Sequence, residues 1–436
     1  MPLSTMVTNE DPPVHAAPDV ASDPILRLHE RWSPVGASVA RVHVVDALRG
    51  FALLGIALLH SVEHFDIVER TPVAYARPAM DEIVARAAFL VFEGKAYAMF
   101  AFLFGFSFFI QLSNGYRRGV DFRWRFAWRL VILGIFGYVH TLFYAGDVLT
   151  IFAAFGLPLV FLYHAPNKVL IGIAVLFLLQ VPELISLFGS LATPGPAQIA
   201  NWGRWDEGMA IWAHGSFRDV LFFNAGPGHV LKWLFMLNTG RYLQMAGLIV
   251  LGLVIGRSRY FENVSDHARA TRRVLFIALP AWAVLHYLHK ALPVFDMAEN
   301  QRASLLFLTK SWSDLAGTAI LISGFVLAYA RFANPDKRSV LATYGRMSLT
   351  NYVTQGLVGT IVFYGYGLAM HAQWGAALSL CFGLVLFGAQ ALVSWYWSDH
   401  FRQGPLEWVW RKLTMLPFRR RSMILAPSTA LTHAEN

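Results

Sequence analysis

Three ionisable residues stand at the two ends of one apolar stretch, DALRGFALLGIALLH, residues 46–60. Asp46 and Arg49 are three residues apart and can pair on one face of a helix. Arg49 and His60 are eleven residues apart, close to three helical turns, so they share that face about 16 Å apart along the axis. Because ionisable groups are costly on a membrane-spanning helix, all three residues are candidates for function.

The residue types indicate which chemistry each end could perform. An arginine fork suits phosphate, and an imidazole can take a proton from a hydroxyl or an amine near neutral pH. We therefore expect Arg49, with Asp46, to bind a cytoplasmic anion and His60 to act as a general base. The simpler alternative is a positive-inside anchor at Arg49, paired with Asp46, and a His60 side chain that reaches the outer interface.

A metal site at this stretch is the weaker interpretation. His60 and His64 are four residues apart and could hold a metal on one helix face, with Glu63 between them in sequence. The remaining ligands cannot be identified, and Glu63 points elsewhere on a helix. We therefore expect no metal.

A second histidine and an aspartate occur in the motif GYVHTLFYAGDVLT. His140 and Asp147 flank a turn at Gly146 between two apolar segments, near the predicted outer level of His60. They are candidate catalytic residues, and a solvated turn is an equally good interpretation.

The motif GRMSLTNYVTQ adds candidate residues for binding a cytoplasmic anion. Arg346 begins an apolar segment and could join Arg49 on the phosphates of a nucleotide. Asn351 and Gln355 are four residues apart and share a helix face. Such amides in lipid bind a ligand or hold helices together, and both alternatives stay open.

The elements that carry these residues are predicted to be membrane helices. The 436-residue chain is 56% hydrophobic and 14% charged, with a mean hydropathy of +0.47, which is too apolar for a soluble domain. We predict an all-α, polytopic transmembrane bundle of about ten spans. The apolar segments lie near 47–65, 87–112, 127–145, 148–164, 169–189, 231–256, 274–292, 312–331, 346–369 and 374–397.

The basic residues indicate the orientation of these spans. The formal charge of +9 comes from Lys and Arg clusters in every other loop, which predicts two cytoplasmic termini and argues against nucleic-acid binding. Residues 1–40 are expected to be a disordered tail without a signal peptide, 41–417 the helical domain, and 418–436 a basic, flexible tail attracted to lipid headgroups. The aromatic-rich outer connection, about 190–230, is an interfacial belt or a lid over a cavity.

Five motifs, in order, resemble the YeiB-like family of bacterial inner-membrane proteins, with coverage from about 41 to 417. They are DALRGFALLGIALLH, LFGFSF, GYVH with GDVLT, GRMSLTNYVTQ and FRQGPLEWVWR. The chain also resembles the wider transmembrane acyltransferase superfamily, in which an arginine and a later histidine occupy an early helix. That resemblance implies donor recognition by Arg49 and general-base catalysis by His60. Many YeiB-like proteins carry asparagine at the position of His60, so the family alone does not assign the base.

Three classes of function are compatible with the sequence. The first is an acyltransferase that moves an acetyl or other acyl group from cytoplasmic acyl-CoA to a periplasmic or membrane-associated glycan or amino-sugar acceptor. The second is an inner-membrane transporter or exporter, which would show broken spans and a mid-membrane carboxylate. The third is a non-catalytic scaffold or sensor. Membrane lipids are expected partners in each case, and homo-oligomerisation is left open.

Overall fold

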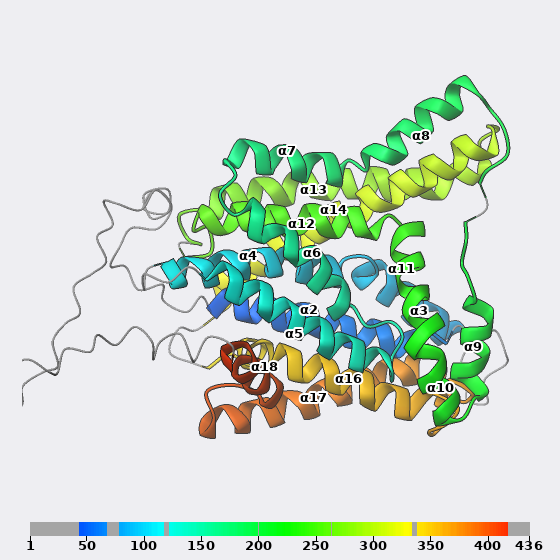
Figure 1. Cartoon of the computed structure of the whole chain (residues 1–436). Helices are drawn as coiled ribbons and strands as arrows, with labels where there is room; N and C mark the ends of the chain where they lie inside the picture. Colours follow the sequence, from blue (N-terminus) through cyan, green and yellow to red (C-terminus); the bar gives the residue numbers. More distant parts are fainter. Residues whose placement is uncertain are drawn as a thin grey trace, which may run out of the picture.

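A computed structural model describes residues 43–67, 78–116, 122–198, 200–262, 264–333 and 338–416. Within these ranges the elements are helices, with no β-strand (Figure 1). The prediction of an all-α bundle is confirmed. The predicted tails, 1–40 and 418–436, lie outside the described residues.

Each of the ten predicted apolar segments is helical, although several are interrupted. Breaks separate α3 from α4, α7 from α8, and α11 from α12, and a π-helical turn at Asn224–Gly228 joins α10 to α11. The helices are α2 His43–Val62, α3 Pro78–Phe92, α4 Ala96–Tyr116, α5 Arg123–Thr141, α6 Leu149–Leu162, α7 Asn167–Leu178, α8 Val181–Ala192, α9 Trp205–His214, α10 Phe217–Phe223, α11 His229–Asn238, α12 Arg241–Arg257, α13 Ala268–Ala291, α14 Glu299–Phe332, α15 Val340–Arg346, α16 Ser348–Phe363, α17 Ala376–His400 and α18 Pro405–Met415.

Six helical stretches of the described chain are long and apolar enough to cross a membrane, and a seventh qualifies if the bent pair α7 and α8 forms one span. The protein is therefore a membrane protein by its helices. The predicted number of ten spans is not reached by this criterion, because helices such as α6 and α16 are shorter than the about 20 residues that a perpendicular span needs.

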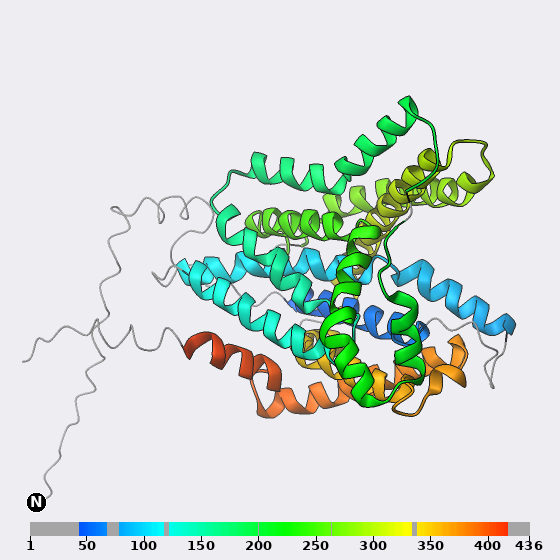
Figure 2. The same cartoon turned by 45° about the vertical axis from the view of Figure 1, so that its right-hand side comes forward.

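The helix α2 lies inside the bundle and contacts α4, α15 and α17 (Figures 1 and 2). The pair α13 and α14 packs on the side of α8, and α16 to α18 lie on the opposite side. The short helices α9 and α10 cover the end of the bundle that lies away from α18. This arrangement leaves α2 with neighbours at both of its ends.

Close backbone contacts fix α15 against the first turns of α2. A Cβ atom on Gly345 would lie 2.0 Å from the carbonyl oxygen of Asp46, and one on Gly50 would lie 2.1 Å from the carbonyl oxygen of Leu341. Only glycine permits this approach without displacing backbone. The contact brings Arg346, at the end of α15, to the same end of the bundle as Arg49.

Candidate functional site: two cavities along one helix

The first cavity lies at the end of the bundle where α2 begins, and we call it the inner cavity. It has a volume of about 240 Å³. Its polar wall combines the guanidinium groups of Arg49, Arg129 and Arg346 with the carboxylate of Glu407. The sequence-predicted pair Arg49 and Arg346 therefore lines one cavity, although the two come from α2 and α15.

Neighbouring side chains hold the arginines of the inner cavity in place. Arg49 donates to Asp46 at 3.0 Å and to Ser107 on α4 at 2.8 Å. The Arg129 guanidinium lies 3.6 Å from the ring centroid of Trp410, whose indole donates to the Arg129 carbonyl at 2.9 Å. The helix α18 thus closes the cavity by a cation–π contact.

Glu407 has a structural task beside this cavity. Its carboxylate accepts hydrogen bonds from the backbone N–H groups of Leu349 at 2.7 Å and Thr350 at 3.1 Å, and it also accepts from the Thr350 hydroxyl at 2.6 Å. A carboxylate at this place caps the first turn of α16 and suits its dipole. The inner cavity therefore keeps an excess of positive charge.

The second cavity, the outer cavity, lies where α2 ends and has a volume of about 230 Å³. Trp205 and Trp212 of α9 line it, so the aromatic outer connection covers a cavity, as the lid alternative predicts. The ionisable residues on its wall are His60, Glu63, Asp66, Glu93, Asp147, Lys232 and Arg241. His60 is half-buried and lines this cavity. The centroid of its ring lies 5.3 Å from that of Tyr144.

The turn after α2 presents two carboxyl groups to the outer cavity in a strained backbone. His64, Phe65 and Asp66 all have positive φ, at 49°, 55° and 77°. Such left-handed residues are uncommon outside glycine and cost about 1–3 kcal/mol each. Burial, reinforced by the charge of Asp66, raises the pKa of Glu63 to about 8. Burial also raises the pKa of Asp66 to about 6, although the hydrogen bond from Tyr144 lowers it in part.

His64 does not join His60 in a common site. Its Nε2 atom lies 3.0 Å from the hydroxyl of Ser379, and its ring stacks on Phe363 with centroids 5.1 Å apart. The described residues contain no group of three or more His, Cys, Asp or Glu side chains arranged to hold a metal ion.

His140 and Asp147 form a buried pair at the edge of the outer cavity. The Nδ1 atom of His140 lies 2.9 Å from Oδ1 of Asp147, and Oδ2 of Asp147 accepts from the backbone of Leu149 at 3.0 Å. Lys232 approaches that oxygen to 3.9 Å. Asp147 is part of the wall of the outer cavity, whereas His140 is not. The Nε2 atom of His140 instead packs against Gly356, where an added Cβ would lie 2.3 Å from it. The pair fixes the start of α6, and its catalytic role stays a prediction.

Asn351 and Gln355 lie in a network between helices, away from both cavity walls. Asn351 donates to the carbonyl of Tyr344 and to Ser394, each at 3.0 Å. Gln355 donates to the hydroxyl of Tyr344 at 2.5 Å, and Gln390 donates to the carbonyl of Asn351 at 3.0 Å. This geometry fits the helix-holding alternative, because the bonds join α15, α16 and α17. A role of either amide in ligand binding stays a prediction.

A thin apolar partition separates the two cavities. Ile56 and Val148 line both of them, so these side chains lie between the two spaces. Tyr352 adds to the inner wall and accepts the backbone N–H of Val148 at 3.1 Å. In this structure the path from Arg49 to His60 is therefore not a continuous polar conduit.

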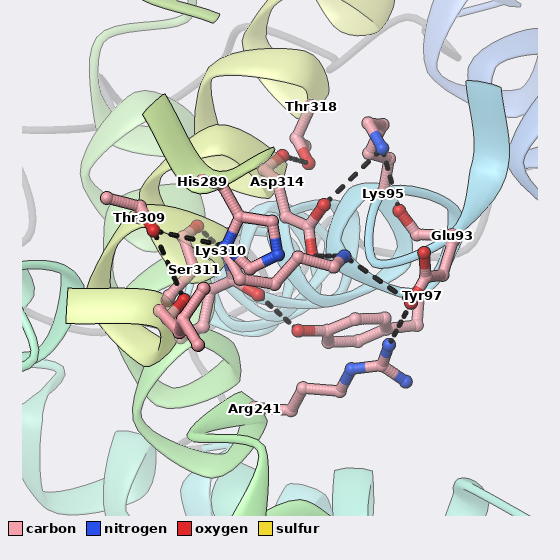
Figure 3. A network of polar contacts seen from close by, with 12 residues as sticks. Glu93, Lys95, Tyr97, Arg241, His289, Thr309, Lys310, Ser311, Asp314 and Thr318 are labelled. Carbon is pink, nitrogen blue, oxygen red and sulfur yellow. Dashed lines mark hydrogen bonds and ion pairs between the residues drawn. The ribbon is translucent and has the colours of Figure 1, made fainter. Parts of the chain in front are cut away.

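A charged network adjoins the outer cavity at the breaks between α3 and α4 and between α11 and α12 (Figure 3). Lys310 pairs with Asp314 at 2.7 Å and with Glu93 at 3.4 Å, and Asp314 lies 3.4 Å from Lys95. Gly94 permits this approach: its φ is +71°, and a Cβ there would lie 2.1 Å from Asp314. The network joins the turn between α3 and α4 to α14 beside the candidate site.

Sequence reasoning missed part of both cavities. Arg129 and Trp410 line the inner one, and Lys232 and Arg241 line the outer one. Lys232 carries a signal in the sequence, since it is an ionisable residue inside a predicted apolar segment. Arg241 carries the same signal, because it also lies inside the predicted segment 231–256. Arg129 stands near the start of a predicted segment and Trp410 lies beyond the last one, where basic and aromatic residues are ordinary, so their types did not distinguish them.

Fold and cavities together define a polytopic helical membrane protein with a cationic inner cavity and a mixed-charge outer cavity. Residues 255–417 match the family model described as protein of unknown function (DUF418). The chain is 31% identical over 399 residues to the uncharacterized protein YeiB of Escherichia coli (strain K12), which covers 85% of this chain and 95% of that protein. It therefore belongs to the YeiB-like DUF418 family.

Two further relatives match along most of their length. The uncharacterized protein YxaH of Bacillus subtilis (strain 168) is 24% identical over 414 residues, covering 87% of this chain and 95% of the relative. An uncharacterized 39.9 kDa protein in the amylase 3' region of Bacillus acidopullulyticus is 25% identical over 408 residues, covering 89% and 97%. No solved structure matches this chain.

Proposed function

We propose that this protein is a transmembrane acyltransferase that uses cytoplasmic acyl-CoA to acylate a hydroxyl or amine of a periplasmic or membrane-associated acceptor, such as a glycan or amino sugar. One observation carries the proposal. The helix α2 exposes Arg49 to a cationic cavity and His60 to a second cavity, and only a thin partition separates the two. The proposal places the protein in the bacterial inner membrane with both termini in the cytoplasm.

The inner cavity supplies groups that recognise a phosphorylated donor. Arg49, Arg129 and Arg346 present guanidinium groups, which bind phosphate oxygens in pairs. Asp46 and Ser107 orient Arg49, and Trp410 orients Arg129. The donor phosphates stay at this end, because they are too polar to enter the apolar partition.

The outer cavity supplies the base for the acceptor. His60 would take the proton from the attacking hydroxyl or amine, whose lone pair forms the new bond to the acyl carbon while the carbon–sulfur bond breaks. The thiolate that leaves takes up a proton and departs toward the inner cavity. Lys232, held by Thr141 at 2.6 Å beside Asp147, adds a positive charge that favours the oxyanion formed on the way.

The partition sets a requirement for this reaction. Arg49 and His60 are separated by a rise of about 16 Å, comparable with a pantetheine arm, on the order of 15–20 Å long. The side chains of Ile56 and Val148 would have to move aside for the arm. Two aliphatic side chains can do so by changing rotamer, without unfolding a helix.

The test uses purified protein in detergent with acetyl-CoA and a panel of amino sugars, and measures free CoA with a thiol reagent. We expect CoA release that depends on the acceptor, and we expect Arg49→Ala to weaken the binding of radiolabelled acetyl-CoA. Exposed Arg331, at the end of α14, provides the matched control Arg331→Ala. Acetyl-CoA binding that is equal in Arg49→Ala and wild type would count against the proposal.

A transporter is the second candidate, and the same partition favours it. Two cavities at opposite ends of a bundle, divided by a thin apolar layer, are the arrangement that alternating access requires, and interrupted helices line the outer one. Proteoliposomes distinguish the two candidates. Uptake driven by a proton gradient, without any CoA release, supports transport and argues against acyl transfer.

A further inference from the structure

The charged network in Figure 3 ends on a cation at the wall of the outer cavity. From the buried end it runs through Lys95, Asp314, Lys310 and Glu93 to Arg241, and the Glu93–Arg241 contact measures 3.6 Å. Three cations thus alternate with two carboxylates, which leaves one positive charge in excess. Lys95 and Asp314 are buried, so the charge excess lies toward the partly exposed end at Arg241.

Arg241 has hydrogen-bonding capacity that the described residues do not use. A guanidinium carries five N–H donors, and no hydrogen bond from this group is found within the described ranges. Its contact with Glu93 is longer than a hydrogen bond. The rings of Phe235 and Tyr97 flank it, with centroids 4.8 Å and 5.4 Å from Cζ. Aromatic rings thus flank the guanidinium, and its N–H donors have no hydrogen-bond acceptor among the described residues.

Arg241 stands at the junction of two cavities. A polar cavity of about 250 Å³ adjoins the outer cavity, and Glu93 and Arg241 line both. Lys310 and His289 also line this adjoining polar cavity. Each cavity is smaller than the about 300–1,000 Å³ of a drug-sized site, so a ligand that reaches Arg241 is small.

Of the other carboxyl groups on the wall of the outer cavity, Asp66 alone is left to oppose this charge at neutral pH. The charge of Asp147 is matched by that of Lys232, 3.9 Å away. Glu63, the carboxyl group whose pKa burial raises to about 8, is mostly protonated at pH 7. Asp66 is the remaining carboxylate, and it accepts a hydrogen bond from Tyr144.

We propose that Arg241 and Lys310 bind an anionic oxyacid group, a carboxylate or a phosphate, on a small molecule at the junction of the outer cavity and the adjoining polar cavity. Glu93 lies beside both cations and competes with that group. The assignment of this molecule as the acyl acceptor rests on the proposed function, and it makes the acceptor an anion; the anion site itself does not depend on acyl transfer.

The experiment measures binding in the absence of acyl-CoA. Full-length protein in phosphatidylcholine nanodiscs is titrated by calorimetry with glucuronate and with glucose, which share a ring but differ in the carboxylate. We expect glucuronate to bind at least tenfold more tightly. Arg241→Gln should remove this preference, Arg241→Lys should restore part of it, and Glu93→Gln should strengthen glucuronate binding several-fold. Arg204→Gln, on the exposed ion pair of α9, is the matched control and should change nothing.

A second arm identifies the source of the anion. Nanodiscs that contain phosphatidylglycerol will abolish glucuronate binding if a lipid headgroup occupies the site, and leave it unchanged if the natural ligand is soluble. Equal affinity for glucuronate and glucose in phosphatidylcholine overturns the proposal, as does unchanged glucuronate binding in Arg241→Gln. If Arg241→Gln does not fold, Lys310→Gln gives the same test. Because no donor is present, a failed acyl-transfer assay leaves this result standing.

Discussion

The two cavities along α2 are nearly equal in volume, about 240 and 230 Å³, but they differ in charge. The inner cavity gathers three arginines, and its carboxylate caps α16. The outer cavity mixes carboxyl groups, cations and His60, within aromatic walls. One end is thus suited to hold a phosphorylated anion, whereas the other is suited to move a proton.

The difference follows from the elements that build each cavity. The inner wall includes the junction of α15 and α16, which a glycine contact holds against α2, and Arg49 and Arg129 have fixed partners there. Interrupted helices and a strained turn form much of the outer wall. Strain and broken helices are common where a site must bind and release a ligand.

The largest effect on the rate of acyl transfer is expected from substitution of His60, the proposed general base. His60→Ala should lower the rate of acyl transfer by about 10²–10⁴-fold, because general-base catalysis contributes that much, while the KM for acetyl-CoA stays unchanged. The matched control is His64→Ala, since His64 contacts Ser379 and does not line the outer cavity. Steady-state CoA release measures both variants. Equal losses in the two variants would show that His60 acts through the fold alone.

The next largest effect is expected at the inner cavity. Arg346→Gln should raise the KM for acetyl-CoA by about 10–100-fold, the loss of one or two charge-assisted hydrogen bonds, with little change in kcat. Binding of the donor at equilibrium should weaken by a similar factor. A fall in kcat with an unchanged KM would assign Arg346 to the chemistry and not to the donor.

Substitutions in the partition between the cavities are expected to change kcat by about tenfold. Ile56→Phe adds bulk between the cavities and should lower kcat by roughly this factor, since overpacking costs about 1–3 kcal/mol. Ile56→Val, which changes the volume little, is the control. Donor binding at the inner cavity should be retained in both variants. Wild-type turnover in Ile56→Phe, with a correctly folded protein, would exclude passage between these side chains.

The smallest effect is expected from pH. Burial raises the pKa of Glu63 to about 8, so this carboxyl group gains its negative charge as the pH rises through that value. The affinity of the outer cavity for glucuronate should then fall several-fold between pH 7 and 9.5. The carboxylate of glucuronate stays ionised in this range.

Other charged groups face Arg241 and call for a control in that titration. Glu93 and Lys310 adjoin it, and Asp66, Asp147, Lys232 and His60 share its cavity. Asp66, with a pKa of about 6, is already ionised at pH 7. Glu63→Gln should flatten the profile. A profile that stays equally steep in Glu63→Gln assigns the change to another of these groups, Lys232 first.

Much of the fold could be predicted from the sequence, because apolar segments of sufficient length are enough to identify buried or membrane helices. All ten predicted segments are helical, and the family resemblance is confirmed. The interruptions at Gly94 and Gly240 were not predicted. A glycine inside an apolar run is tolerated in a helix, and only the packing of Asp314 and Phe307 against these positions shows why the chain turns there.

The candidate site was predictable to a smaller extent. The spacing of Arg49 and His60 places both on one face of α2, and each lines a cavity in the structure. By contrast, Asn351 and Gln355 share a predicted face, but their partners Tyr344, Ser394 and Gln390 lie on other elements. A helical wheel shows which residues share a face and cannot show what that face meets.

The sequence by itself determined the helical character of this chain, the residues that are costly in a membrane, and the axial distance between Arg49 and His60, because helix geometry depends only on local spacing. Tertiary structure decided the rest. It placed Arg129, Arg346 and Trp410 around Arg49, put Ile56 and Val148 between the cavities, and brought Arg241 to Glu93. These contacts join residues far apart along the chain, and their energies depend on burial and on neighbouring charges that exist only once the helices are packed.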